Sequence, residues 1–196
     1  GPRESTRRKW HEQGLPEDVN WHTYLLELLG IEREPQKPRV GLGVSFQMIP
    51  KFEEKVLEHK DGHYVVQDWM GAITEISDEY DYTYIRSAKD FVTRKWHKFP
   101  VENRDDWEEM KWRYDVNTEG RFAKDFEERC NKLRDADYPI TFKFNGPFWQ
   151  LREWLGLENM CIMMIEQPEF IKEMIDFWAN FVSGTMAPIL KNVQVD

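Results

Sequence analysis

Cysteine is scarce in this sequence: only Cys130 and Cys161 occur among its 196 residues. Both lie in helix-like stretches without the spacing of metal ligands, so we expect reduced core thiols in a cytoplasmic protein. Long apolar runs are missing as well, since no stretch approaches the roughly 18 residues of a membrane span. The sequence therefore predicts no membrane partner.

Positive charge is also in short supply. Lys and Arg total 27 against 36 Asp and Glu, which gives a formal net charge of −9. An acidic chain disfavours nucleic acid as a partner, because the phosphate backbone repels it. Aromatic residues, by contrast, make up 14% of the chain. They fill cores and line pockets equally well, so their abundance does not by itself select a function.

The N-terminal part of the chain, residues 1–34, predicts two short helices. Helical spacing of charged and apolar side chains extends over 3–13 and 18–29. Gly14 and Gly30 follow these stretches and are typical helix stops.

The next part, residues 35–103, predicts a β-rich region with a hairpin. Residues 40–48 have the composition of a strand. HYVVQD and AITEIS, within 63–77, are strand-like runs joined by a short turn, which favours an antiparallel hairpin. Residues 82–85 and 91–95 are candidates for further antiparallel strands.

Residues 104–196 predict alternating helices and strands, as in α/β proteins. The expected helices cover 104–114, 123–134, 147–157 and 168–188. A strand is expected over 138–144, and 191–196 are again β-prone. We expect 138–144 to pair in parallel with the segment near Val193.

Such a fold would be incomplete, because one or two parallel strands cannot cover both their faces and their edges. The helix at 168–181 is moreover apolar over most of its circumference. We therefore expect a further C-terminal half of the fold, or a second polypeptide, to cover this helix and complete the sheet.

The junction FNGPFWQ marks the candidate binding site. In parallel α/β proteins, ligands bind where a strand ends and the next helix begins. Asn145, Gly146 and Pro147 are the expected pocket wall. The expected stacking surface for a flat or apolar substrate consists of Phe148, Trp149 and Trp154, although core packing is the favoured alternative for Trp154.

No catalytic residue is identified by the sequence alone. Asp68, at the hairpin turn, is the one candidate for a pocket carboxylate, and a solvated turn aspartate is the favoured alternative. The five histidines are scattered and none is paired with a cysteine at ligand spacing, so we expect no metal bound by this segment.

Several stretches together resemble the uroporphyrinogen decarboxylase superfamily, in its divergent bacterial branch. The resemblance covers nearly the whole chain and is centred on FNGPFWQLREWLGLENM followed by EQPEFIKEMIDFWANFV. Further stretches match in the same order: WHEQGLPEDV, FEEKVLEH, QDWMGAITE and FPVENRDDWEEMK. The resemblance implies a (β/α)8 TIM barrel, of which this chain supplies the N-terminal portion with a β-rich excursion.

The family includes two chemistries. One is cofactor-free decarboxylation of a tetrapyrrole such as uroporphyrinogen. The other is methyl transfer with a corrinoid protein as partner, in which zinc held by His and Cys activates a thiol acceptor. The zinc ligands of such enzymes belong to later barrel strands.

Departures from the decarboxylase pattern favour methyl transfer in a corrinoid-linked system. The motif 15–17 (LPE) matches, but Lys9 and Gln13 stand where the decarboxylases resemble one another in an arginine pair that holds substrate carboxylates. Trp154 stands where they carry a tyrosine. Two alternatives remain: a decarboxylase of a tetrapyrrole, and a non-catalytic half-barrel subunit completed by a second chain.

A substitute for the missing arginine pair lies nearby in the sequence. Arg3, Arg7 and Arg8 carry the same charge and could hold carboxylates. An exposed basic helix face is the favoured alternative for these three residues.

Overall fold

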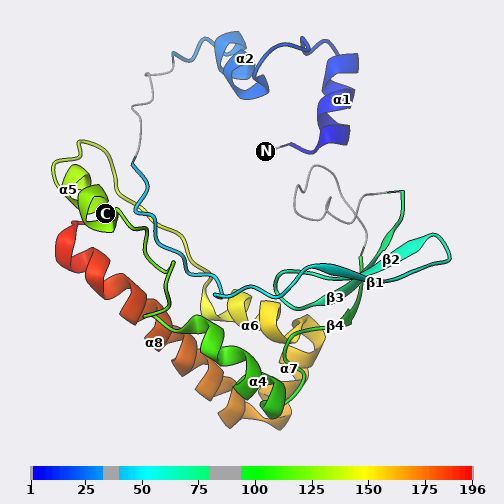
Figure 1. Cartoon of the computed structure of the whole chain (residues 1–196). Helices are drawn as coiled ribbons and strands as arrows, with labels where there is room; N and C mark the ends of the chain where they lie inside the picture. Colours follow the sequence, from blue (N-terminus) through cyan, green and yellow to red (C-terminus); the bar gives the residue numbers. More distant parts are fainter. Residues whose placement is uncertain (1, 33–39, 80–93, 196) are drawn as a thin grey trace.

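The computed structural model describes residues 2–32, 40–79 and 94–195 (Figure 1). Its N-terminal part contains the two predicted helices, α1 (Glu4–Glu12) and α2 (Trp21–Leu28). Asn20 caps α2, since its side-chain oxygen accepts hydrogen bonds from two backbone N–H groups of the first turn. The two helices pack through Trp10 and Trp21, whose ring centroids are 5.6 Å apart.

The predicted hairpin is confirmed and belongs to a four-stranded antiparallel sheet. Its strands follow chain order: β1 (Lys55–Lys60), β2 (His63–Gln67), β3 (Ile73–Ser77) and β4 (Lys95–Lys98). Asp61 and Gly62 join β1 to β2 with positive φ angles of 52° and 75°. Positive φ at both central residues is what a two-residue hairpin turn requires.

Two further strand predictions fall at the edge of the described chain. The candidate strand at 82–85 lies outside the described residues. Of the candidate at 91–95, only 94–95 are described, and Lys95 is the first residue of β4.

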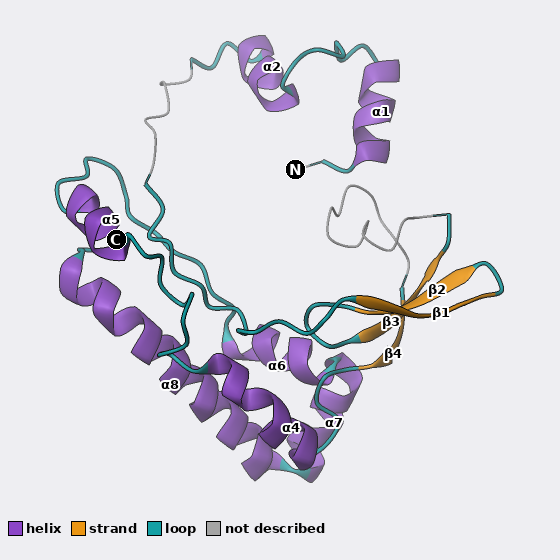
Figure 2. Cartoon of the chain, in the orientation of Figure 1, coloured by secondary structure: helices purple, strands orange, loops and turns teal. Residues whose placement is uncertain are grey.

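The C-terminal part is helical (Figure 2). Its secondary-structure elements contact one another mainly as helix pairs. The helices are α4 (Arg104–Lys111), which continues into the 3-10 turn η1 (Trp112–Tyr114), then α5 (Phe126–Leu133), α6 (Pro147–Leu155), α7 (Leu157–Glu166) and α8 (Pro168–Asn192). In the part of the chain described here, no helix has both the length and the apolarity to span a membrane.

Two helix boundaries differ from the sequence expectation. Gly156, with φ +74°, ends α6 and separates it from α7, a helix that the sequence did not predict. The helix expected to stop near Pro188 continues to Asn192. Pro188 lacks the N–H that would bond the carbonyl one turn earlier, yet the helix continues, and the Asn192 side-chain amide caps its end by donating to the Pro188 carbonyl at 2.7 Å.

The apolar face of α8 is covered within this chain. Met174, Trp178 and Phe181 are buried in a core built with α4, η1, α6 and α7. The expectation that a second chain must cover this face is therefore wrong, because the helices on either side of 138–144 fold back over it.

Residues 40–48 and 138–144 are predicted strands, but neither segment belongs to a β-ladder in the structure, so both strand predictions are corrected. Val44 makes a single antiparallel bridge to Phe122, and no strand is assigned at 138–144 or among the described residues after Asn192. The expected parallel pairing near Val193 is absent from the described chain, as is any pairing of 138–144 with the hairpin.

The two segments nevertheless run alongside each other (Figure 1). Rings of Phe46 and Phe142 are stacked at 6.0 Å, and the Val40 N–H donates to the Tyr138 hydroxyl at 3.3 Å. Both segments line a hollow of about 270 Å3.

Removal of the α4 cap should cost a modest amount of stability. The Asn103 side-chain oxygen accepts a hydrogen bond from the Asp106 N–H at 3.0 Å. We expect Asn103→Ala to lower the free energy of unfolding by about 1 kcal/mol, measured by urea denaturation. Asn180→Ala, on the exposed face of α8, is the matched control and should change it little. Equal effects of the two substitutions would show that the cap has no role.

Candidate functional site

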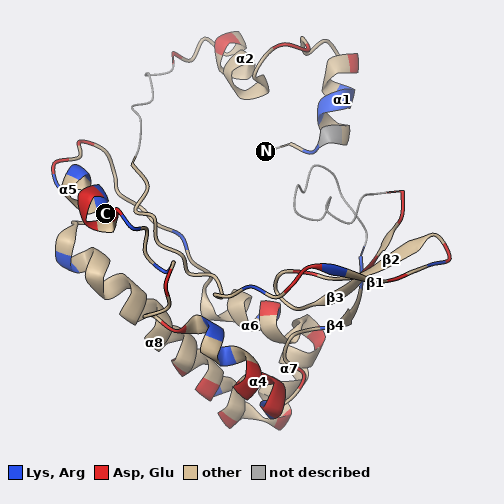
Figure 3. Cartoon of the chain, viewed as in Figure 1, with Lys and Arg blue, Asp and Glu red and all other residues tan. Residues whose placement is uncertain are grey.

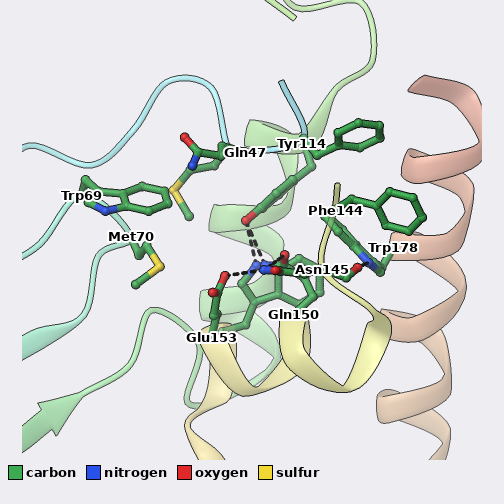
Figure 4. A pocket seen from close by; sticks show the side chains of 12 residues that line it. Gln47, Trp69, Met70, Tyr114, Phe144, Asn145, Gln150, Glu153 and Trp178 are labelled. Atoms are coloured by element: carbon green, nitrogen blue, oxygen red, sulfur yellow. Dashed lines mark hydrogen bonds between the residues drawn. The ribbon is translucent and has the colours of Figure 1, made fainter. Parts of the chain in front are cut away.

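A pocket of about 180 Å3 lies at the start of α6, where the 138–144 segment ends. We call it the α6 pocket (Figure 4). It is enclosed by four further parts of the chain: the 46–48 segment, the turn between β2 and β3, and one residue each from η1 and α8. The lining residues are Phe46, Gln47, Met48, Trp69, Met70, Tyr114, Phe144, Asn145, Gln150, Glu153, Trp154 and Trp178.

Glu153 is the acidic residue of the lining. Its two carboxylate oxygens accept hydrogen bonds from the Asn145 amide at 2.9 Å and from the Trp149 indole at 3.1 Å. Burial raises the pKa of Glu153 above its ordinary value, and the negative charge of nearby Asp68 adds to the effect. Glu153 is thus an oriented carboxyl group that takes up a proton more readily than an exposed glutamate.

Tyr114 forms the polar floor beside Glu153. Its hydroxyl oxygen accepts hydrogen bonds from the Trp154 indole at 3.0 Å and from the Gln150 amide at 3.3 Å. Burial raises the pKa of Tyr114 strongly, so the phenol remains neutral at physiological pH. Figure 4 shows Tyr114 and Glu153 on one side of the pocket and Trp69 and Met70 on the other.

Hydrogen bonds from lining residues also fix the backbone of the turn that precedes α6. The Trp178 indole donates to the Asn145 carbonyl at 2.9 Å, and the Asn145 amide donates to the Gln150 side-chain oxygen at 3.1 Å. These bonds hold the turn that precedes α6 against α8. The pocket wall is therefore oriented before any ligand binds.

Asp68 is buried, so the favoured prediction of a solvated turn residue is wrong. It is 8% exposed, and one of its oxygens accepts hydrogen bonds from the Met70 N–H at 2.9 Å and the Ala72 N–H at 3.0 Å. Burial raises the pKa of Asp68. The carboxylate does not line the pocket; it shapes the turn that places Trp69 and Met70 there.

Of the predicted pocket residues, Asn145 and Trp154 line the α6 pocket, whereas Gly146 and Pro147 do not. The predicted stacking residues Phe148 and Trp149 point outward and are 55% and 50% exposed. Trp154 is also a core residue, as the alternative predicted.

Helical periodicity explains why Phe148 and Trp149 lie outside the pocket. Because α6 begins at Pro147, residues 150, 153 and 154 share its inward face, and 148 and 149 lie on the outer face of the first turn. Sequence reasoning followed the aromatic residues and missed Gln150 and Glu153. Their signal was available: two polar residues at i and i+3 on the same stripe as Trp154.

The remaining predicted residues lie outside this pocket. Cys130 is buried as expected, but Cys161 is exposed on α7, so its assignment to the core is wrong. Arg7 and Arg8 are exposed, as a surface interpretation predicts. Figure 3 shows basic residues on α1. In the described ranges, no three His, Cys, Asp or Glu side chains come together as a metal site.

Comparison of the chain with protein-family models, curated proteins and solved structures finds no match. The function is therefore inferred from the α6 pocket, the one place where buried polar groups, aromatic rings and an oriented carboxylate come together in the residues described.

Proposed function

We propose that this chain is the substrate-binding portion of an enzyme similar to uroporphyrinogen decarboxylases, and that the enzyme transfers methyl groups in a corrinoid-linked system. In this proposal, the extended segments 40–48 and 138–144, which form no ladder in this chain, take the places of the first two strands of a TIM barrel. The location of the α6 pocket supports the proposal, because it lies where an extended segment ends and a helix begins, and barrel enzymes bind substrates at such junctions.

The composition of the pocket lining is the observation that favours methyl transfer over decarboxylation. Among its twelve lining residues, all within the described chain, Glu153 is acidic and none is Lys or Arg. A tetrapyrrole such as uroporphyrinogen carries several carboxylates, which need cationic partners. Glu153 would instead repel them.

The size of the pocket also favours methyl transfer over decarboxylation of a tetrapyrrole. A volume of about 180 Å3 suits a small molecule or the head group of one. It does not accommodate a tetrapyrrole or a corrin ring, so the corrinoid belongs to a partner protein in this proposal. Among the described residues, no group of three His, Cys, Asp or Glu side chains is placed to hold zinc.

Two activity assays on one preparation of the purified protein test the proposed function. We expect uroporphyrinogen to remain unconverted in a fluorescence assay for coproporphyrinogen. We also expect methylcobalamin to form when reduced cobalamin is supplied with methylated amines, thiols or aryl ethers. Conversion of uroporphyrinogen would contradict the proposal. Inactivity in both assays would favour the non-catalytic half-barrel subunit.

A further inference from the structure

We propose that the α6 pocket recognises a small methylated ammonium cation. This inference deepens the proposed function, on which it rests for the pocket being the substrate site. It names the class of molecule that the pocket binds. The evidence is the combination of aromatic rings, a carboxylate whose hydrogen-bond donors are uncharged, and a lining that contains no basic side chain within the described chain.

Half of the lining residues are aromatic. Rings of Phe46 and Phe144 are 5.3 Å apart, and those of Tyr114 and Trp178 meet edge to face at 5.7 Å. The faces of such rings attract cations, and groups of them recognise quaternary ammonium ions. Neutral apolar molecules gain no comparable electrostatic term.

One ring of the lining already binds a cation. The Lys51 ammonium lies 4.7 Å from the centroid of the Trp69 ring. Lys51 itself does not line the pocket. The Trp69 ring thus already makes one cation–π contact at the edge of the site.

The charge of Glu153 is not neutralised by its hydrogen-bond partners. Both donors, Asn145 and Trp149, are uncharged. The guanidinium of the adjacent Arg152 lies over the outward-facing Trp149 ring, 4.5 Å from its centroid. A bound cation would thus supply the positive charge that the pocket wall lacks.

Methylation of the cation follows from the hydrogen-bonding capacity of the site. A primary ammonium group has three N–H donors and needs three acceptors. Each Glu153 oxygen already accepts one bond, from Asn145 or Trp149, and the Gln150 side-chain oxygen accepts one from Asn145, so few acceptors remain free. Besides the amides of Gln47, Asn145 and Gln150, the lining consists of the aromatic rings, Glu153 and the Met48 and Met70 side chains. A methylated cation presents C–H surface instead, which suits this lining.

The test is isothermal titration calorimetry of the full chain with choline and with 3,3-dimethylbutan-1-ol. The second probe has the same shape with a neutral carbon in place of the nitrogen. We expect choline to bind at least tenfold more tightly. Glu153→Gln should lower this preference several-fold, leaving the part due to the aromatic rings, and Glu158→Gln, at the exposed start of α7, should retain it in full.

The affinity of the wild-type chain for choline should also depend on pH. A cation favours the ionised form of Glu153, so binding should tighten as the pH rises through its raised pKa and level off above it. Below that pKa, affinity should fall by up to tenfold per pH unit. The other charged groups facing Glu153 are Asp68 and Arg152, with Arg94 beside Asp68, and Tyr114 stays neutral.

The outcomes separate this inference from the proposed function. Equal affinities of the wild-type chain for the two probes would overturn cation recognition and leave the pocket as a ligand site. A preference undiminished by Glu153→Gln, in a protein that melts like the wild type, would overturn the role of Glu153 in that recognition. Failure of both probes to bind would overturn cation recognition and the site assignment together. Selective choline binding without methyl transfer supports the inference and counts only against the proposed reaction.

Discussion

Replacing Arg121 by Met should lower the free energy of unfolding by about 3 kcal/mol or more, because buried carbonyl groups lose their hydrogen-bond donor. Arg121 is 0% exposed. Its guanidinium donates to the carbonyl of Ser45 at 2.9 Å and to that of Gln47, and on its other side to those of Arg113 at 3.2 Å and Asp115 at 3.3 Å. It therefore joins two segments that share no regular secondary structure.

These two segments carry walls of the α6 pocket. Gln47 lies on one of them, and Tyr114 lies between Arg113 and Asp115 on the other. The Arg121 guanidinium also lies 4.7 Å from the centroid of the Phe181 ring, which fixes it against α8. Loss of Arg121 should thus weaken ligand binding as well as the fold.

Urea denaturation followed by tryptophan fluorescence measures the stability effect of Arg121→Met. Arg134→Met is the control, since the Arg134 guanidinium is exposed and donates to the side chain of Asn131 at 3.2 Å on the same helix. It should change the free energy of unfolding by less than about 0.5 kcal/mol. A value for Arg121→Met that matched the control would contradict the role assigned to this residue.

Gly156→Ala should destabilise the chain by about 3 kcal/mol. Gly156 has φ +74° and ψ 159°, a region occupied almost only by glycine, where another residue costs about 1 to 3 kcal/mol. A Cβ atom there would lie 2.4 Å from a carbon of the Phe99 ring. Displacing that ring from a packed position adds a cost of about 1 to 3 kcal/mol.

The control for this prediction is at the other end of the same helix. Gly146 precedes α6 with φ −64° and ψ 160°, and a Cβ atom there would meet no atom within 4 Å. Gly146→Ala should therefore leave the thermal midpoint nearly unchanged, while Gly156→Ala lowers it by several degrees. If both substitutions had the same small effect, the close packing of α6 and α7 on Phe99 would be refuted.

The local features of this fold were predictable from sequence. The helix α4 begins where Asn103 precedes an acidic first turn, and the hairpin of β2 and β3 follows from its alternating strands. Each of these signals depends on residues a few positions apart. Such signals act before the rest of the chain has packed.

Non-local features were not predictable in the same way. Residues 40–48 and 138–144 have the composition of strands, but a ladder also needs a neighbouring strand within about 5 Å. The Arg121 contacts to carbonyl groups at 45, 47, 113 and 115 have no sequence signature. The buried position of Asp68 likewise depends on the packing of its turn against the helical core.

The junction singled out in the sequence coincides with the α6 pocket, although only some of the residues named there line it. The turn before α6 and Trp154 were identified. Glu153 was not, because a glutamate in a helix is usually exposed. Its role depends on the burial that raises its pKa, which becomes visible only when the 46–48 segment and the β2–β3 turn are placed opposite α6.

The most direct test is a crystal structure of the chain grown with saturating choline chloride. The α6 pocket should contain density for the ammonium group beside the Glu153 carboxylate, between Tyr114 and Trp69. An empty α6 pocket under these conditions, or choline bound instead in the hollow between α1 and α2 that includes Trp10 and Trp21, would contradict the account.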